Sequence, residues 1–348
     1  MAAAVRPLTL IQVGKESTSG TAVAATRRIL TKSGTYRQQQ TMELFEGQLS
    51  GVLSRSVTVP TITREGSQLE ISTDLDFEQI LLPLLSGVKG GVTPSTPAGE
   101  ARLWTFAPSQ TAPSMDSYTL EFVVDDGSTK QNVEAPYGIT TGFEITGGVD
   151  AVPQISWSMD ARKSSDSTYT SGLSLPTVSY ASNLKWTVFC NDTWADMEGS
   201  ASKVPGQVYG FTWALTPLVM PQFYLDGRDD LDFSTVEPQT RQVDLTMQVV
   251  YNTGASDFVE EQMGKKDNSQ KQFLSLELIG ANFTGAASAY NRSIKLRGSF
   301  VHASDSMEEI GGDRDGNSVT TMHLLSQYDP TEAGDIEILI QNSLTSFP

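Results

Sequence analysis

The sequence is poor in the residues that most often carry catalysis or bind metals. Its 348 residues include one cysteine, Cys190, and two histidines, His302 and His323. A single cysteine excludes an intramolecular disulfide framework and a cysteine-rich zinc site. Neither histidine lies in a metal-binding spacing such as HExxH, and there is no complete P-loop, GxGxxG run or GxSxG elbow. We therefore expect no enzyme and no cofactor.

Long apolar runs are also missing. The run from Ile80 to Leu85 has six residues and already contains Pro83, whereas a transmembrane helix needs about 20. Pro7 and Gln12 interrupt the only apolar stretch near the N-terminus, which makes it a poor signal peptide. We expect no membrane segment and no membrane partner.

Positive charge is scarce. Lysine and arginine number 24 against 41 aspartate and glutamate, and the net charge is −17. A protein this acidic gains nothing from displacing the counterions of DNA, so tight nucleic-acid binding is not expected. The composition fits two explanations of the negative charge equally well: it can serve ordinary solubility, or it can form a surface that repels phosphates.

The sequence does contain alternating apolar and polar residues. From Gln68 to Phe77, and again from Gln242 to Tyr251, the apolar residues stand at odd positions opposite polar ones. Such alternation is typical of strands with one face in a core and the other in water. Further strands are predicted at 119–124, 139–146, 154–160, 183–190, 273–279, 293–301, 319–328 and 335–341. The fold class is therefore mainly β.

Two short helices are expected against this β background, and their surroundings repeat. Asp76 and Asp257 each begin a capping-box pattern, with Gln or Glu three residues later. Each follows an alternating strand and precedes a Leu-Glu strand, at Leu120 and Leu276. The repeated order favours a tandem duplication. The alternative is a chance similarity between β segments of like composition.

Three stretches in the same order carry a resemblance to a known family. Residues 14–27 read Gly-Lys-Glu-Ser-Thr-Ser-Gly-Thr-Ala-Val-Ala-Ala-Thr-Arg. Residues 186–228 contain Asn-Asp-Thr-Trp-Ala and Tyr-Leu-Asp-Gly-Arg, and residues 316–340 look like two closing strands. Together they resemble the tail tube (major tail) proteins of long-tailed, non-contractile bacteriophages, the siphophages. The chain is long for one tube module, so the repeat favours relatives with two modules.

The resemblance implies tandem tail-tube modules of β-sandwich or barrel type, each with a short flanking helix, assembling into a large β-barrel ring. The predicted parts are an N-terminal arm, 1–35, a first tube module, 36–165, and a second tube module with C-terminal strands, 166–348. Three chains would make a pseudo-hexameric ring, and stacked rings a hollow conduit that passes double-stranded DNA without binding it specifically. The implied partners are copies of the chain and tape-measure, tail-tip and tail-terminator proteins, in a virion tail assembled in the host cytoplasm.

Two groups of candidate site residues follow. Acidic side chains opposite the apolar faces of the strands are candidates for a negatively charged channel lining, with an outer surface as the competing placement: Glu70, Asp74, Asp76, Glu121, Asp244 and Glu277. Asp76 also has a competing role as a helix cap. The polar arm is predicted to be mobile alone and to order against a neighbouring subunit or ring, with candidate contacts at Gly14, Glu16, Gly20, Thr21 and Arg27.

Three other functions stay open on the sequence alone. The tube protein of a contractile tail or a secretion machine shares the module and differs in its N-terminal run and length. A β-rich adhesin or carbohydrate-binding module would have a signal peptide and clustered exposed aromatics, whereas the five tryptophans here are scattered. A glycan-cleaving enzyme would need a carboxylate pair among aromatic sugar platforms, and no such pair can be named.

Overall fold

The computed structural model describes most of the chain. The described residues are 9–43, 61–111, 114–125, 130–149, 151–181, 185–191, 193–198, 208–227, 231–250, 272–303, 312–314, 316–332 and 334–347. In these ranges the protein is mainly β, with a 17-stranded antiparallel sheet system and a separate two-stranded sheet. No helix in the described ranges is long and apolar enough to cross a membrane.

Seven strands form the largest part of this system. In spatial order they are β3 (Ser33–Glu43), β4 (Thr61–Asp74), β8 (Ala151–Ala161), β7 (Lys130–Gly148), β11 (Val208–Thr216), β14 (Gln242–Val250) and β18 (Asn317–Ser326). The alternation predicted from the sequence produces β4 and β14, which bury Leu69 and Leu245 on one face. Among the described strands β3 pairs only with β4, so the sheet has an open edge and does not close into a barrel.

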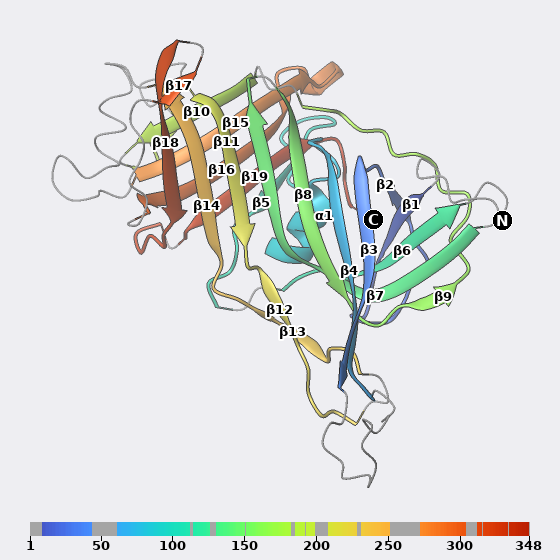
Figure 1. Cartoon of the computed structure of the whole chain (residues 1–348). Coiled ribbons are helices and arrows are strands. Elements are labelled where there is room, and N and C mark those ends of the chain that lie inside the picture. The colour runs from blue at the N-terminus through green and yellow to red at the C-terminus, as the bar shows by residue number, and fades with distance from the viewer. Residues whose placement is uncertain are drawn as a thin grey trace, which may run out of the picture.

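A second group of strands lies on the same side of the molecule as β14 and β18, at the left of Figure 1. Its order is β10 (Trp186–Asn191), β15 (Gln272–Asn282), β16 (Asn291–His302), β19 (Ile336–Asn342) and β5 (Arg102–Phe106). The end of β16 pairs with β18 and joins this group to the seven-stranded sheet. The short strand β17 (Gly312–Arg314) forms a hairpin with β18.

The long strand β7 belongs to two groups of strands. Its first half pairs with β6 (Tyr118–Asp125) and β9 (Ser165–Ser167), and β6 pairs in turn with β1 (Leu10–Lys15) and β1 with β2 (Arg27–Ile29). Its second half pairs with β8 and β11. The strands β12 (Val219–Gln222) and β13 (Thr235–Pro238) form a separate hairpin-like pair that projects from the body together with the β3–β4 hairpin (Figure 1).

A short helical segment lies among the sheets. It consists of α1 (Leu81–Pro83) and a π-helical turn, Leu84–Val88, and Figure 1 shows it behind the strands β4 and β8. All its residues are buried, as expected of a helix that is apolar on every side. Helix geometry begins later than the sequence predicted, because residues 77–80 form a turn. The second predicted helix, at Asp257, lies outside the described residues; a 3₁₀ turn occupies Gly285–Ala287.

One continuous hydrophobic core connects the regions predicted as two modules. It includes Leu69 and Phe143 from the first region and Trp213 and Met322 from the second. The side chains of Phe143 and Trp213 pack with ring centroids 5.5 Å apart across the β7–β11 junction. The predicted division at residue 165 therefore does not separate two independent cores.

The predicted mobile arm is part of the fold from β1 onward, and that prediction was wrong for residues 10–35. β1 lies between β2 and β6, and its Ile11 and Val13 are buried. Gly14 is required there because a Cβ at this position would lie 2.5 Å from the backbone oxygen of Ala24. Truncation through residue 30 would remove two strands and core side chains, so it should unfold the protein.

The Glu16 side chain fixes the turn after β1. Its buried carboxylate accepts hydrogen bonds from the backbone N–H groups of Gly20 at 2.7 Å and Tyr137 at 2.8 Å. It also accepts from the hydroxyls of Ser117 at 2.8 Å and Thr119 at 3.0 Å. Gly20 has a φ of +83°, which favours glycine. A single carboxylate thereby joins the N-terminal segment to β6 and β7.

We expect Glu16→Gln to lower the free energy of unfolding by about 2–3 kcal/mol. Each carboxylate oxygen faces one backbone N–H and one hydroxyl, so an amide NH₂ in either orientation confronts a donor. Urea denaturation measures the difference, with the exposed Glu100→Gln as the matched control. Equal stability of the two variants would contradict this role for Glu16.

Candidate functional site

The seven-stranded sheet has one buried face and one open, polar face. One row of directly paired residues crosses all seven strands on the polar face: Ser33, Ser72, Ser156, Glu144, Ala214, Asp244 and Leu325. A second row crosses six strands: Asp74, Gln154, Thr146, Thr212, Thr246 and His323. Neither row contains lysine or arginine. Small hydroxyl side chains and carboxylates therefore cover a broad surface.

Three of the predicted channel residues lie on this polar face. Glu70 and Asp74 project from β4, and Asp244 projects from β14 and is exposed. The expectation that this side lacks cations needs correction at the β3 edge. Arg37 lies 3.7 Å from Glu70, and Lys32 forms an ion pair with Asp74. Both cations are more than half exposed, so solvent screens these pairs.

Glu144 is an acidic residue of this face that the sequence prediction missed. It is exposed on β7, directly opposite Ala214, whose other neighbour is Asp244. Two strand spacings therefore separate the Glu144 and Asp244 backbones, about 10 Å. The signal was present, because Glu144 stands between the apolar Phe143 and Ile145 in a predicted strand. The polar centre of the sheet thus carries negative charge from both halves of the chain.

Asp76 is buried and cannot line an aqueous channel. Its carboxylate accepts hydrogen bonds from the backbone N–H groups of Glu78 at 2.8 Å and Gln79 at 2.6 Å, and from the Gln79 amide at 2.7 Å. The competing prediction of a cap is thus the better description, although the capped segment is a turn leading into the helix. Burial raises the pKa of Asp76 against these hydrogen bonds and the nearby Arg27.

Glu121 is also buried, so its assignment to the channel lining was wrong as well. It accepts hydrogen bonds from the Thr170 hydroxyl at 2.6 Å, the Thr170 N–H at 2.9 Å and the Ala25 N–H at 3.2 Å. The strand alternation places its side chain opposite Leu120, but the segments around Ala25 and Thr170 cover that face. Glu121 thereby holds two loops onto β6.

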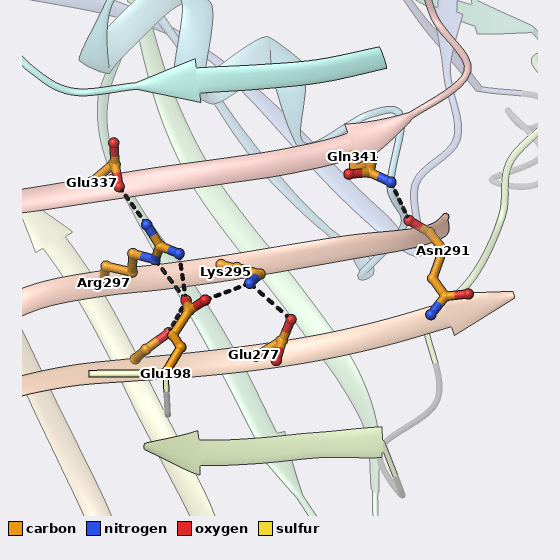
Figure 2. A network of polar contacts seen from close by, with 8 residues as sticks. Glu198, Glu277, Asn291, Lys295, Arg297, Glu337 and Gln341 are labelled. Carbon is orange, nitrogen blue, oxygen red and sulfur yellow. Dashed lines mark hydrogen bonds and ion pairs between the residues drawn. The ribbon is translucent and has the colours of Figure 1, made fainter. Parts of the chain in front are cut away.

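Glu277 lies away from the polar face, in an ion-pair network on β15, β16 and β19 (Figure 2). Lys295 lies 3.0 Å from Glu277 and 2.6 Å from Glu198, and Arg297 pairs with both Glu198 and Glu337. The prediction that Glu277 stands on a side without cations is therefore wrong. Glu198 comes from the segment after β10, so the network attaches that segment to the sheet.

The predicted arm contacts are made within the chain. Gly14 and Glu16 belong to the β1 segment described above, and Thr21 donates its N–H to the backbone oxygen of Thr18. The Arg27 guanidinium lies 4.7 Å from the centre of the Phe347 ring, near the C-terminus. Burial lowers the pKa of Arg27, while nearby Asp76 and Glu78 act to raise it. These residues therefore make contacts within the fold of a single chain.

No group of three or more potential metal ligands comes together in the described part of the chain. His323 lies in the second polar row, where its Nδ1 is 3.2 Å from the Thr246 hydroxyl. Cys190 is half-buried, with its sulfur 2.8 Å from the Gln272 amide oxygen. What the described arrangement offers chemically is a wide polar surface and an open strand edge.

No protein-family model matches the chain, and no curated protein sequence matches it. A functional assignment therefore depends on the geometry above together with the sequence resemblance.

The ion-pair network generates a prediction about acid stability. Burial alone would raise the pKa of Glu198, but hydrogen bonds from Lys295 and Arg297 outweigh it and lower that pKa. A carboxyl whose pKa is lower in the folded than in the unfolded protein stabilises the fold at pH values above its unfolded pKa of about 4.5. This stabilisation is lost as the pH falls through the pKa of the folded protein. We expect Glu198→Gln to cost about 1 kcal/mol at pH 7 and to converge with wild type below pH 4.5. Thermal unfolding against pH tests this, and a constant difference at every pH would contradict it.

Proposed function

We propose that this chain is a structural subunit that polymerises into stacked rings, forming the hollow tail tube of a bacteriophage through which DNA passes. The observation that carries the proposal is the polar face of the seven-stranded sheet, which is continuous across both halves of the chain and ends at the open edge of β3. Such a sheet is suited to form one segment of a ring wall.

The open edge supports side-by-side assembly. From Thr35 to Glu43 the strand β3 is mostly exposed, and it pairs with a described strand on one side only. Unpaired backbone N–H and C=O groups along a strand can add a strand from another chain. Closing a ring in this way removes every open edge, as in any closed barrel.

A recurring pattern of strand pairs supports two modules in one chain. The pairs β3–β4, β4–β8, β7–β8, β6–β7 and β1–β6 have counterparts, in the same chain order, in β11–β14, β14–β18, β16–β18, β15–β16 and β10–β15. The registers agree where the sequence suggested a repeat. Val13 pairs with Leu120 in the first half, and Val188 pairs with Leu276 in the second.

The junction inside the chain suggests how chains would join. β11, the counterpart of β3, already pairs with β7 from Phe143–Leu215 to Gly148–Gly210. By the same relation, β3 of one copy would pair in the next copy beside the end of β16, the counterpart of β7. This end follows the part of β16 that lies between β15 and β19, and it pairs with β18 as the second half of β7 pairs with β8. Three chains with two modules each would then repeat one type of joint around a pseudo-hexameric ring.

The polar face supports a channel lining. Glu70, Glu144 and Asp244 place negative charge on it, and the serines and threonines between them are uncharged. A negative lining repels DNA phosphates and lets the duplex slide without specific binding. The assignment to a non-contractile tail, with tape-measure, tail-tip and tail-terminator partners, depends on the sequence resemblance and belongs to the same proposal.

The ring proposal is tested by electron microscopy of the purified protein together with two neighbouring substitutions, Gln38→Pro and Gln39→Pro. In an edge strand, successive N–H groups point alternately to the partner strand and outward. We expect the variant that loses the outward N–H to stay folded but form no rings. The other variant loses a β3–β4 hydrogen bond and should show a lower melting temperature.

Rings or tubes from wild type and from both variants would show that β3 is not the joint. Discrete monomers of wild type that bind glycans would favour the adhesin alternative over the tube.

The lining is tested by the double substitution Glu144→Lys and Asp244→Lys in an assembled tail. Both side chains are exposed, so the substitutions should not disturb folding and tubes should form normally. DNA ejection should slow, and most strongly at low salt, because the electrostatic field of the lysines then extends beyond about 10 Å. Glu100→Lys serves as the control. If these carboxylates lie on the outer wall of the assembled tube, the lining assignment is wrong.

A further inference from the structure

One end of the subunit carries an exposed apolar knob, formed by Met220, Tyr224 and Leu225. Leu225 is fully exposed, and more than half of the side-chain surface of Met220 and Tyr224 is open to solvent. The knob belongs to the segment of β12 and β13, which projects from the body in Figure 1. Within the described chain these apolar side chains are left largely uncovered.

Hydrogen bonds anchor the segment that carries the knob. The Tyr224 hydroxyl donates to Glu237 at 2.8 Å, and the Ser234 hydroxyl donates to Asp226. Behind them, Arg162 donates to the backbone oxygens of Phe233 at 3.0 Å and Ser234 at 2.8 Å. A segment ordered by its own contacts loses little conformational freedom when it binds, which favours association.

The opposite end of the same sheet carries a hollow of about 370 Å³. No residue that lines it is charged, and more than half of its lining is glycine or apolar: Gly147, Gly148, Ala151, Val152, Tyr209, Gly210 and Phe211. The rest includes Thr146, Thr212 and Thr246 of the second polar row, so the hollow opens at the end of the polar face. The hollow exists because Gly148 pairs with Ala151 on one side and Gly210 on the other, so large side chains are missing there. Val152 at its rim is 52% exposed.

Knob and hollow cannot meet within one chain. The hollow lies at the start of β11, near Val208, whereas β12 follows the other end, Thr216. The length of β11 separates them, about 26 Å at the usual rise per residue. Figure 1 likewise places β12 and β13 below the body and the start of β11 in its upper part.

We propose that the knob of one copy seats in the hollow of a second copy, at the end of the polar face and thus at the rim of the proposed channel, and that this contact stacks one ring on the next. The partner is thus this same chain, bound head to tail. A contact between two different surfaces repeats without closing and so builds a filament. The uncharged hollow suits leucine, methionine and tyrosine, because no carboxylate or cation has to be desolvated.

This inference rests on the proposed ring. Three side chains bury too little surface for a stable pair of single subunits, which usually need about 800 Å² on each partner. Around a ring the contact is made several times at once, and linked contacts reinforce one another. Rings should therefore stack although single subunits do not.

The test compares Leu225→Asp and Val152→Asp, on the two sides of the contact, with Leu175→Asp as a control. Leu175 is 66% exposed but belongs to neither surface. We expect both contact variants to form rings that do not stack, while the control forms tubes like wild type. If either contact variant forms normal tubes, the contact is wrong and the ring proposal stands. If wild type forms neither rings nor tubes, both fail.

A cysteine pair gives the direct measurement. Leu225→Cys protein mixed with Val152→Cys protein, assembled and oxidised, should give a dimer band that a reducing agent removes. Each variant alone should give no more dimer than wild type, which carries only the half-buried Cys190. A disulfide requires the two Cα atoms to lie within about 7 Å. Equal dimer in the mixed and unmixed samples would overturn the contact.

Discussion

The structure depends on the backbone hydrogen bonds of one strand, β7. Its 19 residues pair with β6 and β9 at one end and with β8 and β11 at the other. Because a shift of one residue would move every apolar side chain to the wrong face, this single register fixes both groups of strands at once. It also aligns the polar residues of the two halves, so that Glu144 and Asp244 belong to the same row.

Sequence alternation predicted the half-buried strands such as β4 and β14, because successive side chains of a strand point to opposite faces, but it missed others, including β3 and β11. The fold class and the placement of Glu70, Asp74 and Asp244 on the polar face followed from this rule. The rule fails where a third segment covers the second face. Glu121 alternates like the others, yet the segments near Ala25 and Thr170 bury it. The local sequence pattern cannot predict this burial, because the covering segments are far away in the chain.

The N-terminal segment was also mispredicted, in this case as mobile although it belongs to the fold. Its glycines and hydroxyl residues are typical of a mobile arm, but Gly14 and Gly20 are there for close approach and for a left-handed turn. Both uses of glycine look alike in a sequence. The distinguishing residue is Glu16, a buried carboxylate that needs four donors to be satisfied. Only the arrangement of β6 and β7 around it supplies them.

The β7–β11 junction has a consequence for the kinetics of assembly. Within one chain this joint forms during folding, so no translational freedom is lost between its two sides. If β3 and β16 form the joint between chains, a complete ring requires fewer association steps between free subunits than a ring built from single modules. Ring formation would then depend on a lower power of the subunit concentration. In the proposed ring, covalent linkage of the two halves would let assembly begin at a lower protein concentration.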